Sequence, residues 1–141
     1  MRYSAGNRAV SGDSEAVDWR KLREFAEVDL TRSFVLSWQF EAETLLIDTD
    51  VHLLPSHPFY ERPRPAEKVC IRPALIEFPF CVGISLDGSS IGEDASASLV
   101  GLGNGAITGL RRRADGRYEL RGDFGLVTIE AERPILRLEG S

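Results

Sequence analysis

Three side chains whose types could support chemistry, Asp48, Asp50 and His52, stand at every second position of one short segment. On a β-strand successive side chains point to opposite faces, so the two carboxylates and the imidazole are expected to share one face. A half-buried strand with its polar face in water has the same pattern, so the spacing predicts a strand without proving a site. Apolar residues fill most of the positions between: Leu45, Ile47, Val51 and Leu53.

A divalent metal is the most specific chemistry that this face could support. Alternate strand residues have Cα atoms roughly 7 Å apart, which lets a neighbouring carboxylate and imidazole bind one ion. Asp48 lies roughly 13 Å from His52 on a straight strand, so Asp50 and His52 are the better pair. A third ligand would come from the following loop, with His57 or Glu67 as candidates. This hypothesis predicts a metal-binding domain or a metal-assisted hydrolase.

Burial of the acidic pair separates the two interpretations. Two carboxylates roughly 7 Å apart repel by only roughly 0.6 kcal/mol in water, but by roughly 2.4 kcal/mol at an effective dielectric constant of 20. If Asp48 and Asp50 are exposed, their strand face is scaffold. If they are enclosed, they need a cation or a guanidinium beside them and mark a site.

The loop at residues 55–66 is the second candidate region, because it contains four of the seven prolines. Proline has no backbone N–H for a sheet ladder and fixes φ, so an extended loop is predicted here. His57, Phe59 and Tyr60 place an imidazole, a phenyl ring and a phenol on this stiffened segment. Phe59 and Tyr60, with Asp48 and Glu67, could bind a protein partner. Equally, the two rings could cover an open end of the sheet.

Other catalytic signatures are absent from the sequence. There is no GxSxG motif, and Cys70 and Cys81 have no CxxC spacing, so both are expected to be reduced and buried. Three consecutive arginines at residues 111–113 precede a turn at Asp115 and Gly116, with acids nearby. This arrangement favours solvated strand-edge charges over phosphate binding. A non-catalytic role without a cofactor is therefore the leading hypothesis.

Size and composition predict one globular domain. Of the 141 residues, 43% are hydrophobic and 28% are charged, which is ordinary for a chain that folds by itself. The net charge of −5 opposes docking onto phosphate backbones and argues against nucleic acid as a partner. No apolar run approaches the roughly 18 residues needed to cross a bilayer. A cytoplasmic location without membrane contact is expected.

The first part of the chain divides into an arm and a helix. Residues 1–13 lack periodicity and are expected to form a flexible arm, which is followed by a single β-rich domain at residues 14–141. Between residues 18 and 28, apolar residues recur at three- and four-residue spacing, which predicts an amphipathic helix capped by Asp18. Its Trp19 and Phe25 are expected to plug one end of a sheet.

Most remaining segments alternate with period two and end at turn signals, which predicts about eight short antiparallel strands. The expected fold class is mainly β: a single-domain antiparallel sandwich or barrel-like meander with one N-terminal amphipathic helix. The expected strands lie at residues 33–41, 45–53, 69–71, 76–86, 98–102, 106–113, 118–122, 124–132 and 135–138.

In length, plan and lack of a motif, the chain resembles small uncharacterised bacterial β-domains, some of which are immunity or accessory proteins. With the absence of catalytic signatures, this favours a protein-interaction module whose partner is another protein or a second copy of the chain. Two alternatives stay open. One is the metal-binding domain that uses Asp50, His52 and His57. The other is a small-ligand barrel whose strands enclose a cavity.

Overall fold

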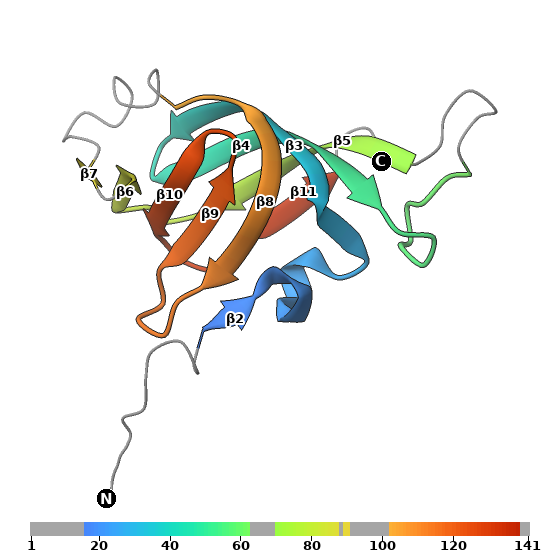
Figure 1. The fold of residues 1–141 in the computed structure, drawn as a ribbon, viewed down its shortest axis with the longest axis horizontal. Coiled ribbons are helices and arrows are strands. Elements are labelled where there is room, and N and C mark those ends of the chain that lie inside the picture. The colour runs from blue at the N-terminus through green and yellow to red at the C-terminus, as the bar shows by residue number, and fades with distance from the viewer. Residues whose placement is uncertain (1–15, 63–69, 88, 91–101, 139–141) are drawn as a thin grey trace, which may run out of the picture.

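The computed structural model of the chain describes residues 16–62, 70–87, 89–90 and 102–138 (Figure 1). Within these residues the protein is mainly antiparallel β-structure, as the sequence predicts. Two short 3-10 turns, η2 (Trp19–Lys21) and η3 (Arg23–Phe25), precede the longest strand. The strands are β2 (Val17–Asp18), β3 (Val28–Glu41), β4 (Thr44–Leu53), β5 (Cys70–Phe78), β6 (Gly83–Leu86), β7 (Ser89–Ser90), β8 (Gly105–Arg112), β9 (Tyr118–Gly122), β10 (Gly125–Glu130) and β11 (Ile135–Leu138).

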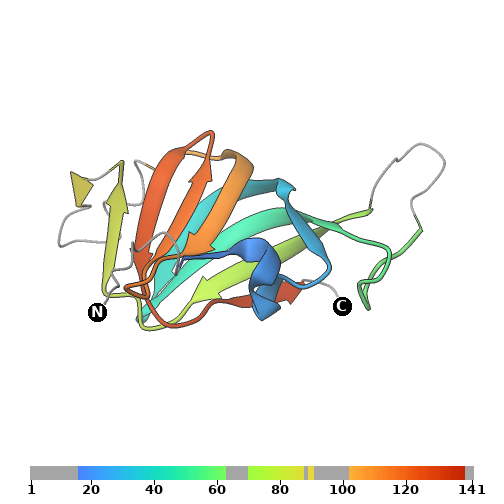
Figure 2. The ribbon, with the colours of Figure 1, turned by 60° about the horizontal axis from the view of Figure 1, so that its bottom comes forward.

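The strands form one strongly curved sheet that is not closed. Nine of its ten strands follow the order β11-β5-β4-β3-β8-β9-β10-β6-β7, and β2 pairs with β8 beside this path. The end strands β11 and β7 do not pair with each other in the part of the chain that the structure describes. Figures 1 and 2 show the sheet curling around a common interior. The predicted barrel-like meander is therefore an open, curved sheet.

The predicted amphipathic helix at residues 18–28 is wrong. Only η2 and η3 are helical, and Leu22 between them is extended, with φ −88° and ψ 124°. The buried residues Trp19, Leu22 and Phe25 are spaced by three, which is the period of a 3-10 helix and not the 3.6-residue period of an α-helix. Ala26 is already extended, with φ −60° and ψ 134°, and Glu27 then adopts a left-handed φ of 63° just before β3 begins.

The helical turns nevertheless plug one end of the sheet, as expected for their aromatic residues. Asp18 caps η2 by accepting a hydrogen bond from the Arg20 backbone N–H at 3.1 Å. Trp19 and Phe25 are buried in the hydrophobic core. Because η2 contacts β8 while η3 contacts β3 and β11, the plug spans the opening between the two halves of the curved sheet (Figure 2).

The long hairpin of β3 and β4 confirms the strongest period-two signal in the sequence. Pairing in this hairpin shifts register between Asp29 and Phe34 and again between Val35 and Ser37. Such shifts bend and twist a strand. The inward-facing apolar residues of β4 are fully buried: Leu45, Ile47, Val51 and Leu53.

The second half is the antiparallel meander that the turn at Asp115 and Gly116 predicts. β8 and β9 form a hairpin through this turn, where Gly116 has a φ of 91°. β10 pairs with β9 on one side and with β6 on the other. Of the strand expected at residues 98–102, only Leu102 belongs to the described residues, and the expected arm at residues 1–13 lies outside them.

The strands expected at residues 69–71 and 76–86 are divided differently in the structure. β5 runs without interruption through Pro73 to Phe78, and β6 begins at Gly83. Proline is tolerated at this point because the described part of β11 pairs with residues 74–77 of β5 and does not reach Pro73. The predicted bend near Pro79 and Gly83 is present, and Phe80 within it has a φ of 51°.

Two smaller expectations concern the thiols and the membrane. Cys70 and Cys81 are free and buried, as predicted. No helix among the described residues is long and apolar enough to span a membrane.

Candidate functional site

The strand face predicted to carry chemistry is present on the outer side of β4, and its acids are half-buried. Asp48 accepts hydrogen bonds from Ser37 Oγ at 2.8 Å and from Gln39 Nε2 at 3.2 Å, both on β3. Asp50 lies opposite Phe34 of β3 in the sheet register. The acids are thus neither fully exposed nor enclosed, and Asp48 ties β4 to β3.

His52 was expected to face solvent together with Asp48 and Asp50. It is instead buried, with only 8% of its surface exposed. It lies opposite Asp29 of β3 and Ile71 of β5, and its backbone N–H donates to Ser33 Oγ at 3.0 Å. The same Ser33 hydroxyl donates to the Asp29 carbonyl at 2.8 Å. His52 therefore belongs to a structural junction, where a buried serine bridges the register shift between β3 and β4.

The proline-rich loop folds back on itself in its described part. The His57 N–H donates to the Leu54 carbonyl at 2.9 Å, and the Tyr60 N–H donates to the His57 carbonyl at 3.0 Å. Arg72 of β5 holds the loop by donating from Nη1 to the Phe59 carbonyl at 3.1 Å. Tyr60 packs against the core while Phe59 is exposed. Tyr60 therefore acts as a cover for the sheet, and Phe59 remains available.

His57 is a local structural element of this loop. Its Nδ1 accepts the Phe59 backbone N–H at 3.0 Å, and the two rings lie 5.9 Å apart. Burial lowers the pKa of His57 below 6.5, the Glu27 carboxylate opposes this shift, and the Arg72 guanidinium adds to it. The neutral imidazole is the form that accepts the Phe59 hydrogen bond.

The suggested metal ligands are not brought together. No group of three or more His, Cys, Asp or Glu side chains is placed to hold a metal ion among the residues that the structure describes. The charged neighbours of His57 are Glu27 and Arg72, whereas Asp50 and His52 belong to the sheet. Glu67 lies outside the described residues. The metal hypothesis therefore remains a prediction that these residues do not support.

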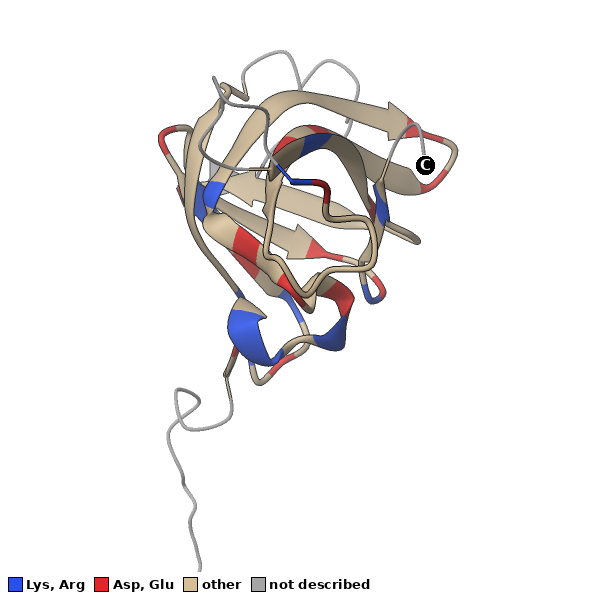
Figure 3. Ribbon diagram, turned by 90° about the vertical axis from the view of Figure 1, so that its right-hand side faces the viewer, with Lys and Arg blue, Asp and Glu red and all other residues tan. Residues whose placement is uncertain are grey.

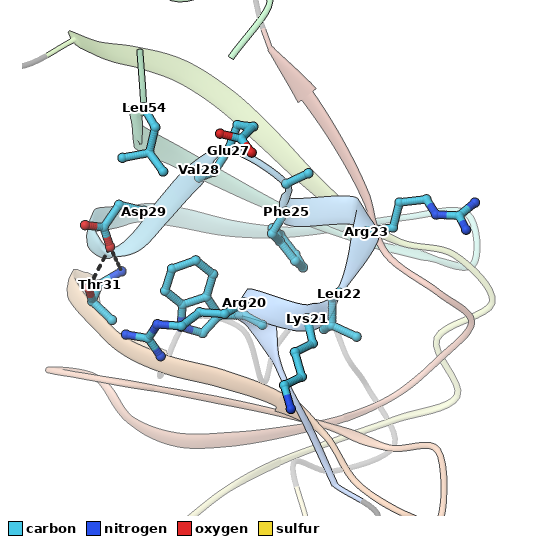
Figure 4. A pocket seen from close by; sticks show the side chains of 12 residues that line it. Arg20, Lys21, Leu22, Arg23, Phe25, Glu27, Val28, Asp29, Thr31 and Leu54 are labelled. Carbon is cyan, nitrogen blue, oxygen red and sulfur yellow. Dashed lines mark hydrogen bonds between the residues drawn. The ribbon is translucent and has the colours of Figure 1, made fainter. Parts of the chain in front are cut away.

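A pocket that sequence reasoning missed lies where η2 and η3 meet the start of β3, and we call it the seam pocket (Figure 4). Its volume is about 520 Å³, within the range of roughly 300–1,000 Å³ typical of ligand pockets. Its lining residues are Trp19, Arg20, Lys21, Leu22, Arg23, Phe25, Ala26, Glu27, Val28, Asp29, Thr31 and Leu54.

The seam pocket has a buried apolar floor and an exposed rim. Trp19, Phe25 and Val28 are each at most 5% exposed, and Figure 4 shows the Phe25 ring directed into the space between the helical turns and β3. Ala26 and Thr31 are exposed and belong to the rim. An apolar centre with a polar edge is the anatomy of a protein-binding site, whereas a small-molecule cavity encloses most of its ligand.

Trp19 contributes a hydrogen-bond donor that has no acceptor among the residues that the structure describes. Its indole Nε1 is buried without a partner, and the Arg20 guanidinium covers the ring, 4.5 Å from its centroid. The other tryptophan, Trp38, donates from Nε1 to the Gly103 carbonyl at 2.7 Å. A buried donor without an acceptor costs roughly 1–3 kcal/mol. Trp19 is therefore an exception that an oxygen atom from a binding partner would satisfy.

Cations gather on the helical side of the seam pocket. Arg20, Lys21 and Arg23 all line it, and Figure 3 shows this cationic stretch on the helical turns at the bottom of the view. Arg20 pairs with Asp18 at 3.1 Å. Lys21 and Arg23 form no ion pair with any part of the chain that the structure describes.

The acids on the opposite wall of the pocket are already engaged. Asp29 accepts hydrogen bonds from the Thr31 backbone N–H at 3.1 Å and from Thr31 Oγ1 at 2.7 Å, and its other oxygen lies 3.6 Å from Arg32. Glu27 accepts a hydrogen bond from the Ser56 hydroxyl. The lining therefore contains three cations on its helical side and two acids on the opposite wall, and those acids accept hydrogen bonds from within the chain.

The arginine run at residues 111–113 does not form a free basic patch. Arg111 Nε lies 2.6 Å from Glu119 Oε1, and Arg113 Nη2 lies 2.9 Å from Asp115. Arg112 alternates to the other face, where its Nε is buried without a partner. The ion pairs favour the structural use of these charges over phosphate binding.

The seam pocket was missed because residues 18–28 were interpreted as one continuous helix. The usable signal was the strict three-residue spacing of Trp19, Leu22 and Phe25, combined with basic residues on both sides of Leu22. Even so, the opposite wall comes from Val28, Asp29 and the distant Leu54, which no local pattern could assign to the same site.

Comparisons with known proteins assign neither region. No family model matches the chain, and no curated protein or solved structure shows significant similarity to it.

Proposed function

We propose that the protein is a non-catalytic interaction module that binds a segment of another protein in the seam pocket. The observation that carries the proposal is the combination, in one pocket of about 520 Å³, of a buried apolar floor and the unpartnered Trp19 N–H. An apolar side chain of a partner would fill the floor, and a neighbouring oxygen would accept the N–H.

The side chains that could begin an acyl-transfer reaction support no enzyme in the described residues. Ser56 and His57 are adjacent, but the Ser56 hydroxyl bonds to Glu27 and His57 Nδ1 accepts the Phe59 backbone N–H. A serine nucleophile requires a base within hydrogen-bond reach. This pair is committed to holding the loop.

Peptide selection tests the proposed function. We expect a random peptide library displayed on phage to yield peptides that bind the full-length chain. With ¹⁵N-labelled protein, these peptides should shift backbone signals of residues 19–31 and of Leu54. Selected peptides that map elsewhere, or a library that yields none, would contradict the proposal.

Two variants that each replace an exposed alanine by tryptophan, one inside the pocket and one outside it, provide a test and its matched control. Ala26 is exposed, lines the pocket and has ordinary extended dihedrals (φ −60°, ψ 134°), so Ala26→Trp fills the pocket without touching the core. Ala114 is equally exposed in the turn between β8 and β9. Selected peptides should lose at least tenfold in affinity with Ala26→Trp and keep it with Ala114→Trp. If the selected peptides bound both variants with equal affinity, the seam pocket would not be their binding site.

A second copy of the chain is the alternative partner. The net charge of −5 makes copies repel one another, which favours a different protein. Size-exclusion chromatography with light scattering decides between them. A mass that rises with concentration from 15.6 kDa in the wild type, but not in Ala26→Trp, would identify self-association through the pocket.

A further inference from the structure

We propose that the segment bound in the seam pocket is acidic, with an apolar side chain on the pocket floor and a carboxylate beside Arg20 and Trp19. This inference rests on the proposed function, because it names the chemistry of the partner at that same site. Its basis is the unpartnered donor of Trp19, the cations of the pocket lining and the exposed rim of the pocket.

The unsatisfied groups at this end of the sheet are all donors. Among the described residues, the buried side-chain nitrogen and oxygen atoms without a partner are Trp19 Nε1 and Arg112 Nε. Arg112 does not line the seam pocket, and its side chain hydrogen-bonds Tyr118. Trp19 Nε1 does belong to a residue that lines the pocket, and an N–H without a partner calls for a ligand that supplies acceptors, which carboxylates do better than any other side chain.

Arg20 lines the seam pocket and lies directly over the Trp19 ring. Its guanidinium covers the Trp19 ring at 4.5 Å from the centroid, yet 62% of its side chain is exposed and it is paired only with the exposed Asp18. Surface ion pairs of this kind are weak. A carboxylate arriving from solvent can therefore compete with Asp18 for Arg20, beside the Trp19 ring.

The electrostatic field of the nearby cations also favours a negatively charged ligand. Lys21 and Arg23 are exposed, and in Figure 4 both side chains extend away from Asp29 and Thr31. They act through their charge on approaching molecules, not through contact with the pocket floor. Such charges act over roughly one Debye length, 8–10 Å at ordinary salt, so binding should weaken as salt rises.

The rim favours a peptide over a small free acid. The lining combines two helical turns, the start of β3 and Leu54 at the end of β4, and much of it is exposed. A small acid would touch only one edge of this surface. A peptide can reach the apolar floor and the cationic edge together, which gives it both anchors at once.

Three synthetic peptides of equal length test the charge. Each carries the same central phenylalanine and leucine, flanked by glutamate, glutamine or lysine. We expect the glutamate peptide to bind the full-length chain at least tenfold more tightly than the glutamine peptide at low salt, with the lysine peptide weakest. Raising the salt should remove most of this difference. Equal binding of the three peptides would overturn the inference.

The two indole N–H signals report where the glutamate peptide binds. They are assigned with Trp19→Phe and Trp38→Phe, and only the Trp19 signal should shift on binding, because Trp38 is already bonded to Gly103. A shift of the Trp38 signal alone would contradict the site. Acetylated glutamate or benzoate that moves the Trp19 signal with the affinity of the peptide would show a small-acid site and overturn the peptide assignment.

Charge-neutralising variants complete the test, with folding checked from the amide spectrum. Arg20→Gln and Lys21→Gln/Arg23→Gln should each weaken the glutamate peptide at least fivefold. The controls are Arg117→Gln for the single variant, since Arg117 also pairs with an aspartate but does not line the pocket, and Arg121→Gln/Arg137→Gln for the double variant. Controls that weaken binding equally would show that only net charge matters, which overturns the inference.

Failure of the two proposals can be told apart. If the glutamate peptide has no advantage but library peptides still lose affinity with Ala26→Trp, the acidic partner is wrong and the interaction module stands. If Ala26→Trp affects no peptide, both fall.

Discussion

The two tryptophans show how the same side chain is used in two ways. Trp38 is bonded to the Gly103 carbonyl and meets the Phe124 ring edge to face at 5.4 Å. Trp19 is just as deeply placed but leaves its N–H unused. Packing alone would favour a phenyl ring at such a position, because a ring without a donor avoids the desolvation cost. An indole there is explained more economically by a ligand that accepts the hydrogen bond.

At the same scale, we expect His57 to titrate below pH 6.5. Burial lowers its pKa and Glu27 opposes the shift, so Glu27→Gln should lower the midpoint further. The folded-state pKa lies below the unfolded value, so this group's contribution to stability is present above pH 6.5 and lost as pH falls through the folded pKa. The ring Cε1–H signal, followed by NMR from pH 4 to 8, measures the midpoint.

The chain contains two histidines, and His57→Gln assigns the signal. A midpoint at or above 6.5, or an upward shift in Glu27→Gln, would show that the imidazole lies more openly in water than the hydrogen bond from Phe59 implies.

Among the elements, the β3–β4 hairpin depends on one buried hydroxyl. Ser33 is fully buried at the register shift and serves both strands, donating to the Asp29 carbonyl and accepting the His52 N–H. A register shift leaves ladder groups unpaired, and a side chain with both donor and acceptor capacity can replace the missing backbone partner. The register shift between β3 and β4 is therefore bridged by a buried polar side chain.

We expect Ser33→Ala to destabilise the protein by about 2–3 kcal/mol, because it leaves a partly buried carbonyl and a buried N–H without the serine hydroxyl that they share. Ser37→Ala is the control, since Ser37 also loses one hydrogen bond, to Asp48, but at a half-buried position. Its cost should stay below about 1 kcal/mol. Urea unfolding measures both, and equal costs would show that Ser33 does not carry the junction.

In the whole molecule, an open sheet is completed by a segment that is barely helical. The edges of a curved sheet that does not close expose its interior at one end, and η2 and η3 cover that end with Trp19, Leu22 and Phe25. The segment of η2 and η3 therefore serves both the core and the seam pocket. Its inner side belongs to the core, and its outer side forms the cationic wall of the seam pocket.

The plug should accordingly behave as core in a stability measurement. Phe25 is 1% exposed while Phe34 on the outer face of β3 is 43% exposed. We expect Phe25→Ala to cost about 3–5 kcal/mol and Phe34→Ala less than about 1 kcal/mol. Guanidinium unfolding compares them. A small effect at Phe25 would mean that the helical turns are dispensable cover and that the pocket wall is not rigid.

The sequence by itself determined the β-rich class, the β3–β4 hairpin and the turn at Asp115 and Gly116. These features depend on side-chain alternation and on turn chemistry, which involve neighbours within a few residues. The same reasoning correctly buried Trp19 and Phe25. It wrongly predicted an α-helix from their spacing, because a three-residue repeat over so short a stretch also fits one face of an α-helix.

Only the tertiary structure decided where a site lies. Leu54 joins the wall opposite Trp19 because β4 pairs back onto the start of β3, and the half-burial of Asp48 depends on its bonds to that same neighbouring strand. Whether a donor is satisfied depends on which distant backbone comes within hydrogen-bond reach, as Gly103 does for Trp38. Long-range proximity is set by strand order and register, and no local period carries that information.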